Sequence, residues 1–260
     1  MTIPIYQADA FTNHLFGGNP AAICPLTEWL SDETMQKIAA ENNLAETAFF
    51  VKNGDGYKLR WFTPAYEIDL CGHATLASAH IIFTELGYKG DTINFETVKA
   101  GVLTIKKDGD KYTMDFPSRP PIPIELPNGL VEALGKEPIA AYRSRDYFVV
   151  YGSENDIVDI SPDFFALSKL DTVGVIITAP GKTVDFVSRF FAPGAGIPED
   201  PVTGSAHCNL IPYWANKLGK EKLHAYQLSS RKGELWCENK GERVLMSGNA
   251  VTYLKGEVFI

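Results

Sequence analysis

Two stretches of the chain carry most of the residue types that could do chemistry. One is Glu67–His80, E-I-D-L-C-G-H-A-T-L-A-S-A-H, and the other is Pro193–His207, P-G-A-G-I-P-E-D-P-V-T-G-S-A-H. Each begins as a turn and runs into a segment with the pattern of a helix. The first N–H groups of a helix lack intrahelical partners and lie at the positive end of its dipole, so each stretch is suited to bind an anion. We expect the two stretches to face each other and form an active site.

Glu46 is a third candidate, because it is the one charge in an apolar run. The run Leu44–Val51, L-A-E-T-A-F-F-V, is otherwise typical of a buried strand. Two interpretations stay open: a carboxylate at a strand end facing solvent, or a partly desolvated acid–base group with a raised pKa. In the second case Glu46, His73 and Asp200 form a set that can move a proton.

His73, Asp200 and Cys71 each have a structural alternative. His73 lies at or next to a predicted helix N-terminus, where the dipole is expected to lower its pKa and favour the neutral imidazole; the alternative is a plain capping histidine. Asp200 precedes Pro201 and could equally be a turn acid. Cys71 is expected either to pack as a small apolar residue beneath a turn or to act as a base.

The two stretches belong to an internal repeat. Cys71–Ala74 matches Thr203–Ala206 at an offset of 132 residues. Upstream, R-W-F-T-P at residue 60 matches R-F-F-A-P at residue 189. One constant offset favours a true repeat over two halves that share only a generic strand–turn–helix pattern. Further residue pairs at the same offset of 132 are Glu67 with Glu199, Gly101 with Gly233, Leu103 with Leu235 and Met114 with Met246.

The repeat predicts an α+β fold of two pseudo-symmetric lobes. Each lobe is expected to be a curled mixed or antiparallel, barrel-like β-sheet around one buried helix, His73–Leu86 in the first and Ser205–Leu218 in the second. The proline-rich segment Pro117–Pro127 marks the boundary, giving lobes over residues 1–117 and 118–260, with the C-terminal strand free to cross back into the first. A cleft between such lobes is a common place for a ligand.

Periodicity and turn residues predict the remaining elements. A helix is expected over Glu33–Glu41, with Ser31 or Asp32 as its cap and Asn42-Asn43 at its end. A shorter helix is expected over Leu126–Leu134. Strands are expected over Ile3–Ala10, Ala21–Cys24, Leu44–Val51, Tyr57–Thr63, Thr92–Thr97, Gly101–Lys107, Lys111–Phe116, Tyr147–Tyr151 and Val173–Thr178.

Composition bounds the class of protein. The chain has 260 residues, of which 45% are hydrophobic and 22% charged, as in an ordinary globular protein. Its net charge of −8 argues against nucleic acid or an anionic membrane as a partner. The first ten residues show no signal-peptide pattern, no apolar run approaches the ~20 residues of a membrane span, and the cysteines form no CxxC pair. We expect a soluble, cytoplasmic protein.

The same residue types also occur in two other chemistries. A two-thiol racemase needs cysteines at both repeat positions, and the chain has Cys71 but Thr203. Threonine is neither acid nor base near neutral pH, so two-thiol racemisation is disfavoured. The candidate metal ligands are Cys71, His73, His80, His207 and Cys208. Their spacings match none of the common metal sites, so we expect no metal and no other cofactor.

The motifs resemble those of the phenazine-biosynthesis PhzF-type family, which is similar to the diaminopimelate epimerase superfamily. The resemblance rests on D-A-F-T, F-G-G-N-P-A-A, N-L-A-E-T-A-F-F, R-W-F-T-P, D-L-C-G-H-A-T-L-A-S-A-H and G-I-P-E-D-P-V-T-G-S-A-H, spread over most of the chain. It implies two lobes that each curl around a central helix. It also implies a homodimeric isomerase that acts on a small carboxylate-bearing substrate without metal or cofactor.

The resemblance further implies roles for individual residues. Glu46 in N-L-A-E-T is the implied catalytic acid–base group, and His73 and Asp200 hold the substrate or assist proton transfer. One residue departs from the pattern. Ala45 stands where the family member that isomerises trans-2,3-dihydro-3-hydroxyanthranilate has serine, which argues against that substrate. The implied substrate-binding residues are Gly72, Ala74, Gly204, Ser205 and Asn19.

Three functions follow, the third from a different class than the first two. The preferred one is a cofactor-independent isomerase in which Glu46 moves a proton between carbons of a small carboxylate. The second is an amino-acid racemase or epimerase that uses Cys71 as one base. The third is a non-catalytic protein that binds a small anion on the same scaffold.

Overall fold

The computed structural model describes residues 1–260 and divides into two compact units. Unit 1 comprises Met1–Asp115 together with Ser247–Ile260, and unit 2 comprises Phe116–Met246. The expected boundary after residue 117 therefore lies two residues beyond the observed one, and residues 247–260 belong to unit 1. Neither unit holds a helix with the length and apolar content needed to cross a membrane.

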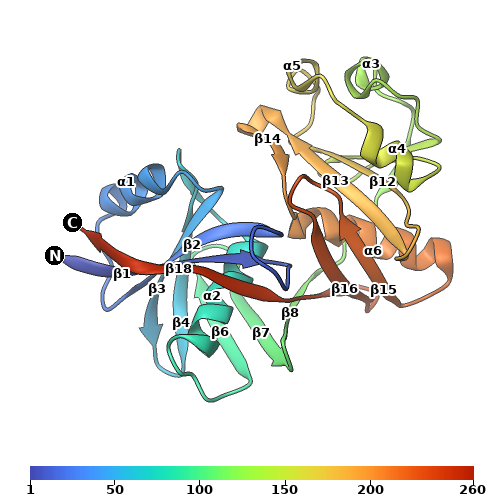
Figure 1. The fold of residues 1–260 in the computed structure, drawn as a ribbon. Helices are drawn as coiled ribbons and strands as arrows, with labels where there is room; N and C mark the ends of the chain where they lie inside the picture. Colours follow the sequence, from blue (N-terminus) through green and yellow to red (C-terminus); the bar gives the residue numbers. More distant parts are fainter. The chain divides into compact units, whose positions relative to one another are not determined.

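Unit 1 is a curved mixed sheet (Figure 1). Its strands pair in the order β18-β1-β2-β3-β4-β6-β7-β8, with β2–β3 and β4–β6 parallel and the other pairs antiparallel. The short β5 pairs with β4. The elements are β1 (Thr2–Ala10), β2 (Asn19–Leu26), α1 (Asp32–Asn42), β3 (Glu46–Asn53), β4 (Gly56–Phe62), β5 (Glu67–Ile68), α2 (Gly72–Thr84), β6 (Thr92–Thr97), β7 (Val102–Asp108), β8 (Lys111–Pro117) and β18 (Ala250–Phe259).

Helix α2 forms the centre of unit 1 because it is apolar on every side. Every residue from His73 to Phe83 is buried, and the helix packs against β1, β2, β3 and β18. His80 ties it to two strands, since its Nδ1 lies 2.9 Å from the Tyr112 hydroxyl and its Nε2 lies 2.9 Å from Thr252 Oγ1. The buried helix expected over His73–Leu86 is confirmed, and it ends two residues early at Thr84.

Helix α1 lies outside the curve of the sheet and packs against β3 and β4 (Figure 1). The Ser31 hydroxyl caps it by accepting a hydrogen bond from the Thr34 N–H at 3.1 Å, as expected from the sequence. Asn43 ends it in the left-handed conformation with φ of 49°, which asparagine tolerates better than most residues. This helix holds the crossover that lets β2 and β3 pair in parallel.

Unit 2 repeats the strand pairing of unit 1. Its order is β9-β10-β11-β12-β13-β15-β16, with β11–β12 and β13–β15 parallel. This matches β18-β1-β2-β3-β4-β6-β7 strand for strand, so the internal repeat is real. The elements are β9 (Ile122–Ile124), α3 (Leu130–Leu134), β10 (Ala140–Arg143), β11 (Tyr147–Val150), α4 (Glu154–Asp159), α5 (Phe164–Leu167), β12 (Val175–Pro180), β13 (Phe186–Ala192), η1 (Pro193–Ala195), β14 (Ile197–Asp200), α6 (Gly204–Leu218), β15 (Lys222–Gln227), β16 (Gly233–Asn239) and β17 (Arg243–Gly248).

The same ion pair fixes the loop before the central helix in each unit. Arg60 binds Glu67 through two hydrogen bonds of 2.7 Å, and Arg189 binds Glu199 through bonds of 2.8 and 3.0 Å. Bidentate pairs of this kind give geometric specificity as well as energy. The pair therefore sets where α2 and α6 begin, and the repeat preserves it.

Helix α6 lies at the centre of unit 2. Of the three shorter helices of this unit, the sequence predicted only α3. Helix α6 begins at Gly204, one residue before the expected start, and packs against β15 and β16. Helix α4 packs against β12 and β13. The sequence predicted α3 within Leu126–Leu134 but neither α4 nor α5, because helices of six and four residues give too short a periodicity.

Two buried histidines, one in each unit, make the fold sensitive to acid. Burial lowers the pKa of His80 and of His207 to about 4, against about 6.5 in an unfolded chain. The unfolded state therefore binds more protons between pH 4 and 6.5, and stability falls as the pH falls through that window. We expect each histidine to remove on the order of 1–2 kcal/mol of unfolding free energy between pH 6.5 and 5.

Chemical denaturation at the two pH values measures this loss. The variant His207→Gln should show a smaller loss than the unmodified chain. The control His14→Gln changes an exposed histidine and should leave the loss unchanged. Equal stability of the unmodified chain at pH 6.5 and 5 would contradict the prediction.

Candidate active site

Parallel pairing of β2 and β3 places two polar side chains at one edge of unit 1. Asn19 is the first residue of β2 and Glu46 the first of β3, and the register sets Ala21 opposite Glu46. Helix α2 begins at Gly72, with Cys71 in the N-cap position. Contacts from His73 to both Asn19 and Glu46 show that the two strand starts and the helix start meet.

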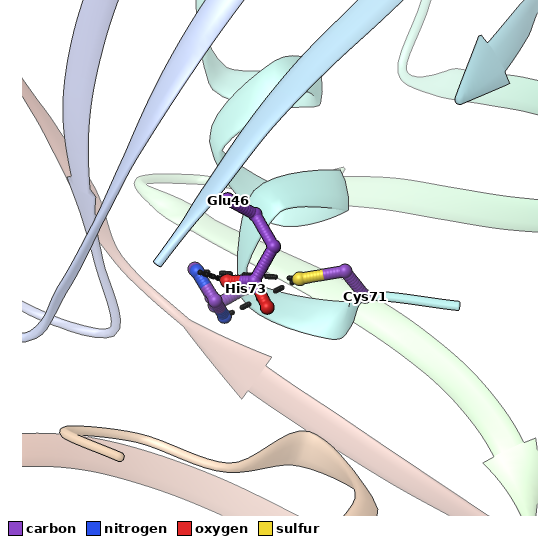
Figure 2. Close-up of side chains that lie close together, drawn as sticks. All are labelled: Glu46, Cys71 and His73. Atoms are coloured by element: carbon purple, nitrogen blue, oxygen red, sulfur yellow. Dashed lines mark hydrogen bonds and ion pairs between the residues drawn. The ribbon is translucent and has the colours of Figure 1, made fainter. Parts of the chain in front are cut away.

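The cluster at this point is made of three side chains around the His73 ring. Glu46 Oε2 lies 3.1 Å from His73 Nε2, and Asn19 Nδ2 lies 3.2 Å from Nδ1. The Cys71 Sγ lies 3.5 Å from Nδ1 and 4.0 Å from Nε2. Figure 2 shows Glu46, His73 and Cys71 pointing toward one another. The structure thus brings together three residues expected to form the site, Glu46, His73 and Asn19, and places beside them Cys71, the candidate base of the alternative racemase.

Glu46 does not face solvent, so the first interpretation of this residue is wrong. It is 7% exposed, since the first residue of β3 lies against the start of α2. Its Oε2 is buried and, although within ion-pair distance of His73, accepts no hydrogen bond. The structure therefore leaves a lone pair of this carboxylate oxygen without a protein donor aligned to it.

His73 differs from the sequence-based expectation of a neutral imidazole. Burial by itself disfavours the charged ring, but a hydrogen bond with the Cys71 sulfur and the charge of the Glu46 carboxylate outweigh it and raise the pKa of His73 well above its ordinary value. The expected effect of the helix dipole is about half a positive charge spread over a turn, whereas Glu46 places a full negative charge at 3.1 Å.

Cys71 keeps its proton in this cluster. Burial, together with the Glu46 charge, raises the pKa of the Cys71 thiol to about 11. A base needs its deprotonated form near the working pH, which the resting thiol does not supply. The geometry therefore favours Glu46 over Cys71 as the group that accepts a proton.

The first turn of α2 supplies backbone donors beside the cluster. Gly72 and Ala74 are its first and third residues, and the Cys71 side chain makes no capping hydrogen bond to them. The first N–H groups of a helix have no carbonyl partner within it. This helix start is therefore suited to a carboxylate, as the sequence indicated.

In unit 2, Asp200, Gly204 and Ser205 gather at the start of α6. Thr203, the N-cap, uses its hydroxyl to donate to Asp200 Oδ2 at 2.6 Å and does not cap the helix. Gln227 fixes this turn: its Nε2 donates to the Asp200 carbonyl at 2.8 Å, and its Oε1 accepts from the Thr203 N–H at 2.9 Å. These contacts hold the Asp200 carboxylate, and the backbone of the turn that carries it, in one orientation.

Sequence reasoning missed two residues of this turn. Gln227 ends β15, and Arg145 donates through Nη2 to Ser205 Oγ at 3.2 Å while also pairing with Asp146. No local pattern identifies either residue. The parallel pairing of β13 with β15 sets Ser188 opposite Gln227, and this contact follows only from the fold.

Comparison with known proteins shows close relatives over the whole chain. A family model described as phenazine biosynthesis-like protein, PhzC-PhzF, matches residues 8–256. A protein of Pseudomonas aeruginosa named an uncharacterised isomerase is 48% identical over 260 residues and covers 100% of both chains. A crystal structure of a PhzF-family phenazine biosynthesis protein from Enterococcus faecalis is 49% identical, with a TM-score of 0.98 over 100% of both chains.

A more distant structure bears on the fold alone. The structure of a predicted epimerase from Pseudomonas aeruginosa is 18% identical and has a TM-score of 0.76 over 99% of both chains. The expected α+β fold of two similarly built lobes, of the diaminopimelate epimerase type, is confirmed by these neighbours and by the repeated strand order. The family match extends over nearly the whole chain, and the relatives agree with it. The chain belongs to the phenazine biosynthesis PhzF-like family.

Proposed function

We propose that this protein is a cofactor-independent isomerase that moves a proton between carbons of a small carboxylate-bearing substrate, with Glu46 as the proton carrier. The name isomerase given to the Pseudomonas relative supports the reaction class. The observation that carries the role of Glu46 is its buried Oε2, which lies in the cluster yet accepts no hydrogen bond. A carboxylate lone pair that no protein donor occupies can accept a proton, which is the first requirement of a general base.

The proposed reaction balances without a co-reactant. Glu46 takes a proton from one carbon of the substrate, the electron pair of that C–H bond shifts through an adjacent double bond, and Glu46 returns the proton to the carbon at its far end. His73 contacts Asn19 and lies 3.1 Å from Glu46. It stabilises the ionised form of the Glu46 carboxylate between turnovers. The buried surroundings strengthen this electrostatic contact relative to water.

Substrate binding is proposed to rest on the helix starts. Gly72 and Ala74 supply backbone donors at α2, and Asn19 contributes its amide. In unit 2, Gly204 and Ser205 are assigned substrate contacts, and Asp200 assists in holding the substrate. Each helix N-terminus carries roughly half a positive charge, which supports a carboxylate over a neutral group. The protein is further proposed to work as a homodimer in the cytoplasm, which light scattering and cell fractionation test.

A panel of small unsaturated carboxylates tests the reaction class. Each compound is incubated with the protein in D2O and followed by NMR. The proposal predicts that at least one is converted to an isomer of unchanged composition, with deuterium at the carbon that gains the proton when Glu46 exchanges with solvent. Ligands that stabilise the protein without any product from the panel would favour an anion-binding protein instead.

The carboxylate itself is the second part of the test. Replacing the carboxylate of an active compound by a carboxamide is expected to lower kcat/KM by about 10- to 100-fold, since charge-assisted hydrogen bonds contribute about 1.5–3 kcal/mol. Steady-state kinetics of the matched pair of compounds measures the ratio. A carboxamide turned over as well as the acid would contradict recognition at the helix starts.

A further inference from the structure

The cluster around His73 also has the composition of a metal site. Glu46, Cys71 and His73 each offer one ligand atom, and these atoms all lie within 4.8 Å of one another (Figure 2). Carboxylate oxygen, thiolate sulfur and imidazole nitrogen are the three donor types that zinc accepts. Sequence spacing gave no sign of this site, because Glu46 comes from β3, far from the C-G-H of Cys71–His73 in the chain.

The separations suit a tetrahedral ion. Zinc bonds of about 2.3 Å to sulfur and about 2.0–2.2 Å to nitrogen and oxygen set the ligand atoms roughly 3.3–3.6 Å apart. Here Glu46 Oε2 and His73 Nε2 are 3.1 Å apart, and Cys71 Sγ and His73 Nε2 are 4.0 Å apart. The third separation, between the Glu46 and Cys71 ligand atoms, lies within 4.8 Å, so side-chain shifts of about an ångström would meet the ideal values. Three protein ligands leave the fourth position for water or substrate.

Charge and outer contacts support zinc as well. The Cys71 thiolate and the Glu46 carboxylate together carry two negative charges, which balance the two positive charges of the bound ion, and the protons that the ligands lose pass to solvent. The bound ion therefore brings no uncompensated charge into the interior. The Asn19 amide contacts Nδ1, and in a site where Nε2 binds the ion, rotation of this amide would let its oxygen accept a hydrogen bond from the Nδ1–H.

Unit 2 provides an internal comparison. The repeat sets Thr203 where unit 1 has Cys71 and Ser205 where it has His73. Both hydroxyls are poor zinc ligands, and Thr203 is already bonded to Asp200. The Glu46–Cys71–His73 group is the one place in the chain where three such side chains converge, so one ion per chain is expected.

We propose that Glu46, Cys71 and His73 form a zinc-binding site, and that zinc bound there inhibits the isomerase by occupying the lone pair of Glu46. The binding stands on the geometry alone. The inhibition rests on the proposed function. The ion is an inhibitor in this proposal and not a catalytic cofactor.

Titration of the whole purified chain with Co²⁺, and then with Zn²⁺, tests the binding. Bound cobalt reports its ligands by absorption, and a thiolate ligand adds an intense charge-transfer band in the near ultraviolet. We expect this band to saturate at one Co²⁺ per chain and to disappear when Zn²⁺ displaces the cobalt. Failure of the band to form in the unmodified chain overturns the site without recourse to any variant.

Variants assign the site to its residues. Cys71→Ala should abolish the band and lower zinc affinity by more than the about 10- to 100-fold typical of a lost outer-shell partner. The control Cys24→Ala removes another buried cysteine of unit 1 and should bind as the unmodified chain does. A band that survives Cys71→Ala, or that Cys24→Ala removes, overturns the proposal. Binding with no loss of turnover would leave the metal site standing and count against Glu46 as the proton carrier.

Discussion

Replacing Glu46 by glutamine is expected to lower turnover by about 10²–10⁴-fold, the range that a general acid–base group contributes. Glutamine keeps the size of the side chain but cannot carry the proton. The fold should survive, because His73 can lose its proton when its carboxylate partner is gone and so avoids an unpaired buried charge. Turnover of an active compound from the carboxylate panel, together with far-ultraviolet circular dichroism, measures both effects.

Two matched variants test whether the loss of turnover is specific to the Glu46 carboxylate. Glu46→Asp keeps the carboxylate but withdraws it by about one C–C bond, and misplacement on that scale costs on the order of 100-fold. Glu41→Gln removes an exposed carboxylate from α1 in the same unit and should leave turnover unchanged. Full activity in Glu46→Gln, or equal losses in Glu46→Gln and Glu41→Gln, would remove Glu46 from the mechanism.

Replacing Trp214 by alanine is expected to lower the free energy of unfolding of unit 2 by about 3–5 kcal/mol. Trp214 is 2% exposed, its ring stacks on Phe186 with centroids 5.8 Å apart and planes within 2°, and its Nε1 donates to Thr178 Oγ1 at 2.9 Å. The substitution opens a cavity beneath α6 and removes a hydrogen bond from a buried hydroxyl. Chemical denaturation followed by circular dichroism measures the loss.

The control for this variant lies on the same helix. Leu218 ends α6 and is 43% exposed, so Leu218→Ala should change the unfolding free energy by less than about 1 kcal/mol. Trp214→Phe keeps most of the apolar contact but loses the bond to Thr178, and should fall between the two. Similar losses for Trp214→Ala and Leu218→Ala would show that α6 does not form the core of unit 2.

The sequence predicted the repeated parts of the fold best, because both the apolar pattern and the match between the two halves indicated them. The apolar run of α2 and its match in α6 predicted both ends of both helices to within two residues. Strand β6 was predicted with its observed bounds, Thr92–Thr97. The sequence did not predict the short helices α4 and α5, because four to six residues are too few to show a helical periodicity.

The candidate site was predicted by residue type but not by contact. Motifs identified Glu46 and His73, whereas their 3.1 Å contact depends on the parallel register of β2 and β3 against the start of α2. This contact helps raise the pKa of His73, which the sequence predicted to be lowered. The prediction considered only the local helix end and could not include a carboxylate from a distant strand. The positions of Gln227 and Cys71 among the site residues likewise follow from the fold and not from a local sequence pattern. Local sequence therefore suggested which groups could act, and the fold decided which of them meet.

The central claim, that Glu46 carries the proton, is tested most directly by the origin of the transferred hydrogen. An active compound labelled with deuterium at the carbon that loses the proton is incubated in H2O with the unmodified chain, Glu46→Gln and Cys71→Ser. We predict isomer formation with partial retention of the label by the unmodified chain and neither product nor label loss with Glu46→Gln. Label loss and product with Glu46→Gln at the unmodified rate, together with their disappearance in Cys71→Ser, would contradict the account and assign the proton to the thiol.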